Sequence, residues 1–194
     1  MPELILASTS KYRRELLERL RVPFRCVAPT VDEAAEAAKL STSDPALLAG
    51  HLARLKAQDV ATREPQAITI GSDQVCAYRG QILHKPGTAE KAREQLQQLQ
   101  GKQYELLTAV SVFQGREVVT WVVKTHLFMR KLSKDEIARY IAADEPLDCA
   151  GSYKIESLGI SLFESIQGSD HTAIIGLPLI QTAQVLRELG AAVP

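Results

Sequence analysis

Patterns typical of helices and of strands alternate along the whole chain, and this alternation restricts the fold more than any other feature. No low-complexity linker and no internal repeat interrupts it. The alternation disfavours all-helical and all-β classes and predicts an α/β or α+β fold. With 194 residues, 45% of them hydrophobic, the chain can bury one sizeable core. We therefore expect a single domain over residues 1–194, built as two lobes around a cleft.

Apolar spacing predicts where the individual elements lie. Short apolar or β-branched runs indicate strands, and apolar residues three or four positions apart indicate helices. The strands are expected at residues 4–7, 24–28, 68–70 continuing to 75–78, 81–83, 104–113, 118–129 and 160–166. The helices are expected after Ser10, Asp44, Thr88 and Ser133 and from Pro178. Residues 104–113 and 118–129 flank Gly115 and predict a β-hairpin.

The first strand and helix contain the first functional signal. Ser8 and Ser10 follow the strand, and Ser10 stands where an N-cap is expected. Lys11, Arg13 and Arg14 crowd the first helical turn, where the helix dipole disfavours cations. A bound phosphate would reverse this penalty, because hydroxyl, backbone N–H and guanidinium groups all donate to it. A capped surface helix with solvated arginines explains these residues equally well.

Asp73 is the first candidate for a catalytic acid or base. It directly follows an apolar strand, between Ser72 and Gln74, so it suits the floor of a cleft. Partial burial would raise its pKa and let it accept a proton from water. Glu33 could complete a site for a hard cation such as Mg²⁺. An Asp that caps a turn, and a solvated acidic loop at Asp32 and Glu33, remain open alternatives.

Lys56 and Lys85 are candidates for binding a polyphosphate, since ammonium groups act as point charges on phosphate oxygens. Both could equally be surface lysines. Neither GxxxxGK[ST] nor GxGxxG occurs in the chain, which argues against a P-loop or Rossmann enzyme. The four histidines have no spacing typical of metal ligands.

Composition limits the partners and the cellular setting. The 23 basic and 23 acidic side chains cancel, so no overall field would attract a nucleic-acid polymer. The three cysteines are far apart and predict neither a disulfide framework nor a zinc site. No basic leader and no apolar run of about 20 residues is present, so we expect a cytoplasmic protein without membrane contact.

The order of these motifs resembles the Maf family of nucleotide pyrophosphatases. The motifs are Ser8-x-Ser10-x-x-Arg13, Val31-Asp32-Glu33, Lys56-Ala57, Gly71-Ser72-Asp73-Gln74-Val75 and Lys85-Pro86, followed by Cys149-Ala150-Gly151-Ser152, Gly159-Ile160 and Ile175-Gly176-Leu177-Pro178. The resemblance therefore covers nearly the whole chain. It implies an elongated mixed sheet with helices on both sides, as in inosine-triphosphatase-like folds, a cleft between two lobes, and a homodimer as a possible assembly.

The resemblance also implies roles for single residues. Asp73 would be the proton acceptor, and Glu33 would belong to the catalytic or metal cluster with Mg²⁺ or Mn²⁺. The phosphate path would be lined by Ser8, Ser10, Arg13, Lys56 and Lys85. The branch it resembles most is that of the 7-methyl-GTP pyrophosphatases, in which the specificity positions correspond to Tyr12, Gln74 and Glu156. The expected reaction converts the small-molecule nucleotide into a nucleoside monophosphate and diphosphate.

The chemistry of a methylated guanine agrees with two of these positions. Methylation at N7 gives the base a positive charge, which strengthens its attraction to the face of Tyr12. Glu156 could accept hydrogen bonds from N1–H and the exocyclic amine of guanine. Without the resemblance, an exposed helical tyrosine and a solvated acid would explain the same residues.

Three residues depart from the usual family pattern, and two other functions stay open. His84 and Ala109 replace glycines, and Lys11 stands where many members carry proline. Ala109 would matter if its backbone needed a positive φ or a close approach to substrate. The alternatives are the dTTP and UTP pyrophosphatase branch of the same family, and a nucleotide-binding regulator of cell division with little catalysis.

Overall fold

The sheet that organises the molecule contains strands from both halves of the chain. The computed structural model describes residues 2–193. Its strands are β1 (Leu4–Leu6), β2 (Arg25–Cys26), β3 (Ile68–Tyr78), β4 (Gln81–Leu83), β5 (Gln103–Gln114), β6 (Glu117–Met129) and β7 (Phe163–Gly168). Their order is β2-β1-β3-β5-β6-β7, and β4 pairs with β3. Strand β1 is parallel to both neighbours, and the other pairs are antiparallel, so the sheet is mixed as expected.

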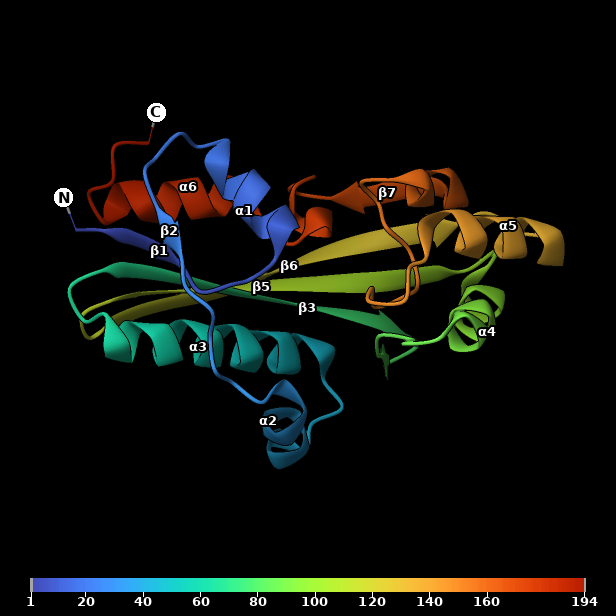
Figure 1. The fold of residues 1–194 in the computed structure, drawn as a ribbon, viewed down its shortest axis with the longest axis horizontal. Coiled ribbons are helices and arrows are strands. Elements are labelled where there is room, and N and C mark those ends of the chain that lie inside the picture. The colour runs from blue at the N-terminus through green and yellow to red at the C-terminus, as the bar shows by residue number, and fades with distance from the viewer. Residues whose placement is uncertain (1, 194) are drawn as a thin grey trace.

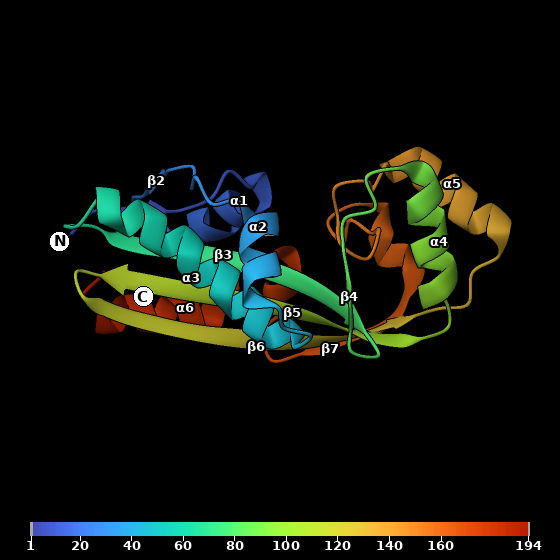
Figure 2. The ribbon, with the colours of Figure 1, turned by 90° about the horizontal axis from the view of Figure 1, so that it is seen from below.

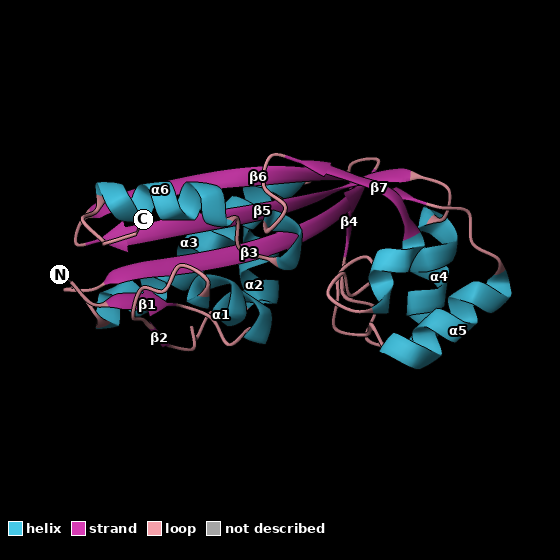
Figure 3. Ribbon diagram, turned by 90° about the horizontal axis from the view of Figure 1, so that it is seen from above, coloured by secondary structure: helices cyan, strands magenta, loops and turns pink. Residues whose placement is uncertain are grey.

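Six α-helices cover this sheet in two groups (Figures 1 and 2). They are α1 (Lys11–Glu18), α2 (Glu33–Leu40), α3 (Pro45–Arg63), α4 (Ala89–Leu99), α5 (Lys134–Asp144) and α6 (Leu179–Glu188), with 3-10 turns η1 (Leu158–Leu162) and η2 (Ala173–Ile175). Helices α1, α2, α3 and α6 lie at one end, which we call the first lobe (Figure 3). Helices α4 and α5 lie at the other end with β4 and β7, which we call the second lobe. No helix within residues 2–193 is long and apolar enough to cross a membrane.

The two faces of β3 pack against different helices. Ile68 and Ile70 share one apolar cluster with the side chains of α1 and α6. Val75 and Ala77 point to the opposite face and pack with α3. Since successive side chains of a strand point to opposite faces, Asp73 lies on the α3 face. A third cluster, around Tyr104 of β5, fills the second lobe between the sheet, α4 and α5.

Most of the predicted boundaries are confirmed, because local capping chemistry sets them. Ser10, Asp44, Thr88 and Ser133 all accept hydrogen bonds at the starts of their helices, and Ser133 forms the predicted capping box with Glu136. The long hairpin is confirmed as β5 and β6. Pro178 precedes α6 as its N-cap residue rather than beginning the helix.

The prediction of a strand over residues 160–166 is wrong in its first half. Residues 158–162 form η1, and the strand β7 begins only at Phe163. The reason is a contact with α5, since Asp144 accepts hydrogen bonds from Ser157 Oγ and Gly159 N and folds the chain back. The expected loop at Glu33 is also shorter than predicted, because Asp32 caps α2 and Glu33 is its first residue.

Because Gly71 has no side chain, α3 packs close to the sheet. A Cβ atom on Gly71 of β3 would lie 2.4 Å from Ala53 O and 2.6 Å from Ala57 N. Ala53 and Ala57 are fully buried, so a stripe of small residues on α3 rests on the backbone of β3. This close packing sets the distance between Lys56 on α3 and Asp73 on β3.

Candidate active site

Lys56 joins the two predicted acidic residues. Its Nζ donates to Asp73 Oδ1 at 2.6 Å and lies 2.8 Å from Glu33 Oε1. The side chains of Lys56 and Asp73 are 7% and 8% exposed, whereas that of Glu33 is 52% exposed. Residues from α3, β3 and the start of α2 therefore meet at one point, with Asp73 as the buried acid and Glu33 at the solvent side.

Burial controls the acidity of Asp73. Removal from water raises the pKa of this carboxyl above its ordinary value, and Glu33 raises it further. Lys56 and Arg13 lower this pKa without cancelling the effect of burial. A carboxyl with a raised pKa holds a proton more readily than one in water, which is the property a general base needs.

The start of α1 lies beside this acidic pair. Arg13 is half-buried, and its charge interacts with both Asp73 and Glu33, although burial is the largest influence and lowers its pKa. Ser10 Oγ accepts from Arg13 N as the helix cap, and Ser8 Oγ accepts from Ser10 N. The charge of Arg13 thus acts on Asp73, the predicted proton acceptor, and the two serines lie in the turn leading into the same helix.

Within residues 2–193, one edge of β3 has no partner strand around Asp73. On this edge, β3 pairs with β1 through Ile68–Ile70 and with β4 through Cys76–Tyr78. Within residues 2–193, the intervening segment 71–75 has no partner strand on that edge. The chain leaves β1 towards Ser8 on one side of the gap and leaves β4 towards Lys85 on the other. Residues from both lobes therefore surround an unpaired edge of the central strand.

Gln74 has a structural contact that the sequence did not indicate. Its Nε2 donates to Thr108 Oγ1 at 3.0 Å and to the carbonyls of Ala173 and Ile174 at 3.0 and 3.1 Å. Thr108 Oγ1 also donates to Ala173 O. These bonds fix η2 to the sheet through the amide nitrogen of Gln74.

The carbonyl of Gly176 is a second contact that sequence patterns did not reveal. It accepts from Arg13 Nε at 3.0 Å and from Ser72 Oγ at 2.8 Å. Asp170 holds this loop from the other side, with Oδ1 accepting from Thr172 N and Oδ2 from Ile180 N. The Gly176 carbonyl at the end of η2 therefore holds the guanidinium of Arg13 through its Nε.

Tyr12 and Glu156 influence one another electrostatically. Partial burial raises the pKa of Tyr12, and the negative charge of Glu156 raises it further. Burial likewise raises the pKa of the Glu156 carboxyl, while Lys154 lowers it. The charge of Glu156 therefore acts on Tyr12 at the start of α1.

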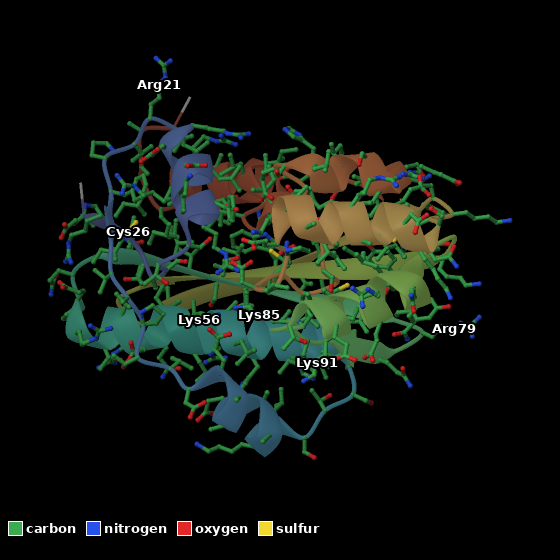
Figure 4. All side chains as sticks on the ribbon, turned by 45° about the vertical axis from the view of Figure 1, so that its right-hand side comes forward. Arg21, Cys26, Lys56, Arg79, Lys85 and Lys91 are labelled. Carbon is green, nitrogen blue, oxygen red and sulfur yellow. The ribbon has the colours of Figure 1, made fainter. Side chains whose placement is uncertain are left out.

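Lys85 lies in the exposed loop between β4 and α4. Figure 4 labels Lys56 on α3 and Lys85 in the loop that follows β4. Gln95 of α4 secures this loop by donating to His84 O and accepting from Ser152 Oγ. The side chain of His84 is exposed, so this departure from the family pattern is accommodated at the surface.

The other two departures fit the fold. Ala109 is a buried residue of β5, directly opposite Asp73, and it is not among the residues with positive φ. The backbone at Ala109 therefore carries no strain from a positive φ. Lys11 is exposed and pairs with Glu15 on the surface of α1 at 3.7 Å.

The donor set fits a divalent cation that is shared with a phosphate chain. Within the described residues 2–193, no cluster of three or more His, Cys, Asp or Glu side chains could hold a metal by itself. Glu33 and Asp73 nevertheless converge on the same Lys56 Nζ. Magnesium is commonly held by one or two carboxylates together with substrate phosphates and water, and the half-exposed carboxylate of Glu33 can be one of them.

Comparisons with known proteins identify the family of the chain. The family model described as "Maf-like protein" matches residues 3–189. A 7-methyl-GTP pyrophosphatase of Xanthomonas campestris is 48% identical over 195 residues, which cover all of both chains. Proteins of the same name from Pseudomonas aeruginosa and Bdellovibrio bacteriovorus are 44% and 45% identical, covering 100% and 95% of both chains respectively.

Proposed function

The chain belongs to the Maf family, and on that premise we propose that it hydrolyses 7-methyl-GTP to 7-methyl-GMP and diphosphate. The observation that carries this proposal is the bridge from Lys56 to the buried Asp73 and to Glu33, beside Arg13. A buried acid with a raised pKa suits proton abstraction from water, and adjacent cations suit a polyphosphate. The relatives named above point to the same activity.

In the proposed reaction, Asp73 is the proton acceptor. The oxygen of a water molecule attacks the α-phosphorus of the nucleotide, and its proton passes to the Asp73 carboxylate. The bond between the α-phosphorus and the bridging oxygen to the β-phosphorus breaks, so diphosphate leaves with the bonding electrons. Lys56 engages Oδ1 of Asp73, which leaves Oδ2 to receive the proton.

Charge around the triphosphate comes from several elements. Arg13, Lys56 and Lys85 would offset the negative charge that accumulates on the departing diphosphate. Ser8 and Ser10 would donate hydroxyl hydrogen bonds at the start of α1. A bound Mg²⁺ or Mn²⁺ would polarise the phosphate oxygens, and Glu33 would hold it. The half-exposed carboxylate of Glu33, next to the buried Lys56 and Asp73, supports this assignment.

The base would lie between the lobes. Tyr12 would stack on the positively charged methylated guanine, and Glu156 would accept hydrogen bonds from its N1–H and amine. Gln74 Oε1 would complete the specificity set. The electrostatic effect of Glu156 on Tyr12 supports this pairing. The single domain, the cleft, the homodimer and the cytoplasmic location remain predictions from the sequence.

A comparison of substrates tests the proposal. Purified protein is incubated with Mg²⁺ or Mn²⁺ and with 7-methyl-GTP, GTP, dTTP or UTP, and both nucleoside monophosphate and diphosphate are measured. We expect the highest kcat/KM for 7-methyl-GTP and no release of single phosphate. Faster turnover of dTTP and UTP would instead support the pyrimidine branch. No diphosphate from any nucleotide would refute the hydrolase assignment.

A further inference from the structure

The loop that carries Glu156 is hydrogen-bonded to the carboxyl end of α5. Asp144, the last residue of that helix, accepts from Ser157 Oγ at 2.7 Å through Oδ1 and from Gly159 N at 3.1 Å through Oδ2. These two bonds hold residues 157 and 159, which follow Glu156 in the chain. Both carboxylate oxygens of Asp144 therefore accept hydrogen bonds from this loop.

Other groups of α5 hold the start of the same loop. Tyr140 Oη accepts from Lys154 N at 2.9 Å. Lys154 Nζ donates to the carbonyl oxygens of Asp144 and Glu145 at 2.9 and 3.1 Å. The loop thus closes on the carboxyl end of the helix, with Glu156 between its two anchored ends.

Gly159 makes this arrangement tight. A Cβ atom at Gly159 would lie 2.3 Å from Lys154 O, so the backbones of these two residues are in direct contact. The loop from 154 to 159 is consequently a narrow turn. In such a turn a shift of the Asp144 contacts would be transmitted to Glu156.

The position of Asp144 is unfavourable for the helix alone. An acidic side chain in the last turn faces the negative end of the helix dipole. Lys or Arg would be the favourable choice there. The two hydrogen bonds to the loop, and the Lys154 ammonium on the adjacent carbonyl, compensate for this repulsion.

We propose that Asp144 is a positioning residue for base recognition, which holds Glu156 at the edge of the guanine ring opposite Tyr12. This inference rests on the proposed function. Asp144 itself touches no substrate, so its loss should weaken nucleotide binding and leave the chemical step at Asp73 intact. The selectivity of the site would thus depend on a helix of the second lobe.

The variant that tests this is Asp144→Ala, with Asp144→Asn as the conservative replacement. Alanine removes both acceptors, and we expect KM for 7-methyl-GTP to rise about tenfold, with kcat changed by less than about twofold. Asparagine can accept from Gly159 N and donate to Ser157 Oγ, so it should restore KM to within about threefold of the wild type. Hydrogen exchange of residues 154–159 should be faster only in the alanine variant.

Ser133→Ala is the matched control. Ser133 caps the other end of α5, so its loss weakens the same helix without touching the loop. It should lower the melting temperature and leave KM unchanged. A KM rise of equal size in Ser133→Ala, or an unchanged KM in Asp144→Ala, would overturn the proposal.

The outcomes also separate this inference from the proposed function. A wild-type protein that releases no diphosphate refutes the hydrolase assignment and the claim about selectivity together. Hydrogen exchange of residues 154–159 does not depend on catalysis. If exchange there is the same in Asp144→Ala and in the wild type, the positioning role itself is refuted.

Discussion

The ammonium of Lys56 lies 2.6 Å from Oδ1 of Asp73, and both side chains are almost fully buried. The lysine favours the ionised carboxylate, whereas removal from water favours the protonated acid. Burial is the larger influence, so the pKa of Asp73 is raised. The pair therefore supplies a base whose proton affinity is increased but still adjustable by its neighbours.

The first prediction concerns the acidic side of the pH–activity profile. Only the ionised form of Asp73 can accept a proton, and its pKa is above the ordinary value of 3.8. Activity should therefore fall as the pH decreases through this raised pKa, at higher pH than for a carboxyl in water. The measurement is kcat/KM for 7-methyl-GTP against pH. A profile that stays flat down to pH 4 would exclude Asp73 as the base.

Two neighbours of Asp73 should move this profile in opposite directions. Lys56 lowers the pKa of Asp73, so Lys56→Met should shift the acidic limb to higher pH and reduce kcat. Glu33 raises the same pKa, so Glu33→Gln should shift the limb to lower pH. Profiles of the remaining activity in both variants provide the measurement. Shifts of the same sign in both would contradict the electrostatic arrangement described here.

Asp73→Asn should separate catalysis from binding. The amide keeps the size of the side chain and can still accept from Lys56, but it cannot take up the proton of water. We expect hydrolysis to be lost while the Kd for the nucleotide stays within about tenfold, or about 1.4 kcal/mol. Calorimetric titration in Mg²⁺ measures the affinity. Turnover at the wild-type rate would remove Asp73 from its role, and a regulator without catalysis would keep its cellular effect in this variant.

Local chemistry explains why much of the fold could be predicted. The caps at Ser10, Asp44 and Ser133 depend on residues within three positions of each other, so they are visible in the sequence. The sequence does not predict the turn at Gly159, because apolar and polar residues alternate over 160–166 as they do in a strand. The contact that overrides this pattern comes from Asp144, fifteen residues away.

The sequence predicts the charged side chains of the site but not the backbone carbonyls that contact its residues. The chemistry of Lys56 indicates phosphate binding and that of Asp73 indicates a proton acceptor, and the structure brings the two residues together. The Gly176 carbonyl that orients Arg13 lies 163 residues further along the chain and carries no side-chain signal. Gln74 likewise bonds carbonyls 99 and 100 residues away. Such contacts follow from tertiary packing, which periodicity does not encode.

The contacts of Gln74 predict a loss of stability as well as a change in specificity. Gln74→Leu leaves the carbonyl of Ile174 without its donor and should lower the free energy of unfolding by about 1–3 kcal/mol. Denaturant unfolding measures this. Gln97→Leu, on the exposed side of α4, is the control and should change stability by less than about 0.5 kcal/mol. Altered substrate preference at unchanged stability would mean that Gln74 serves the base alone.

Gly71 links the packing of α3 to the chemistry of Asp73, so a single methyl group should affect both. In Gly71→Ala the new Cβ would lie 2.4 Å from the backbone oxygen of Ala53, which forces α3 away from β3. Overpacking of this kind costs about 1–3 kcal/mol, and we expect kcat to fall as well because Lys56 moves from Asp73.

The matched control is Gly50→Ala, at a glycine within α3 itself. Its nearest new contact would be Val122 Cγ2 at 4.0 Å, so the methyl group fits without displacement. Alanine also has the higher helix propensity, so this variant should be as stable as the wild type or more stable by up to about 1 kcal/mol, with unchanged kcat. Thermal unfolding and steady-state kinetics on both variants provide the measurements. If Gly71→Ala unfolds at a lower temperature but keeps its kcat, then the distance between α3 and β3 does not control catalysis.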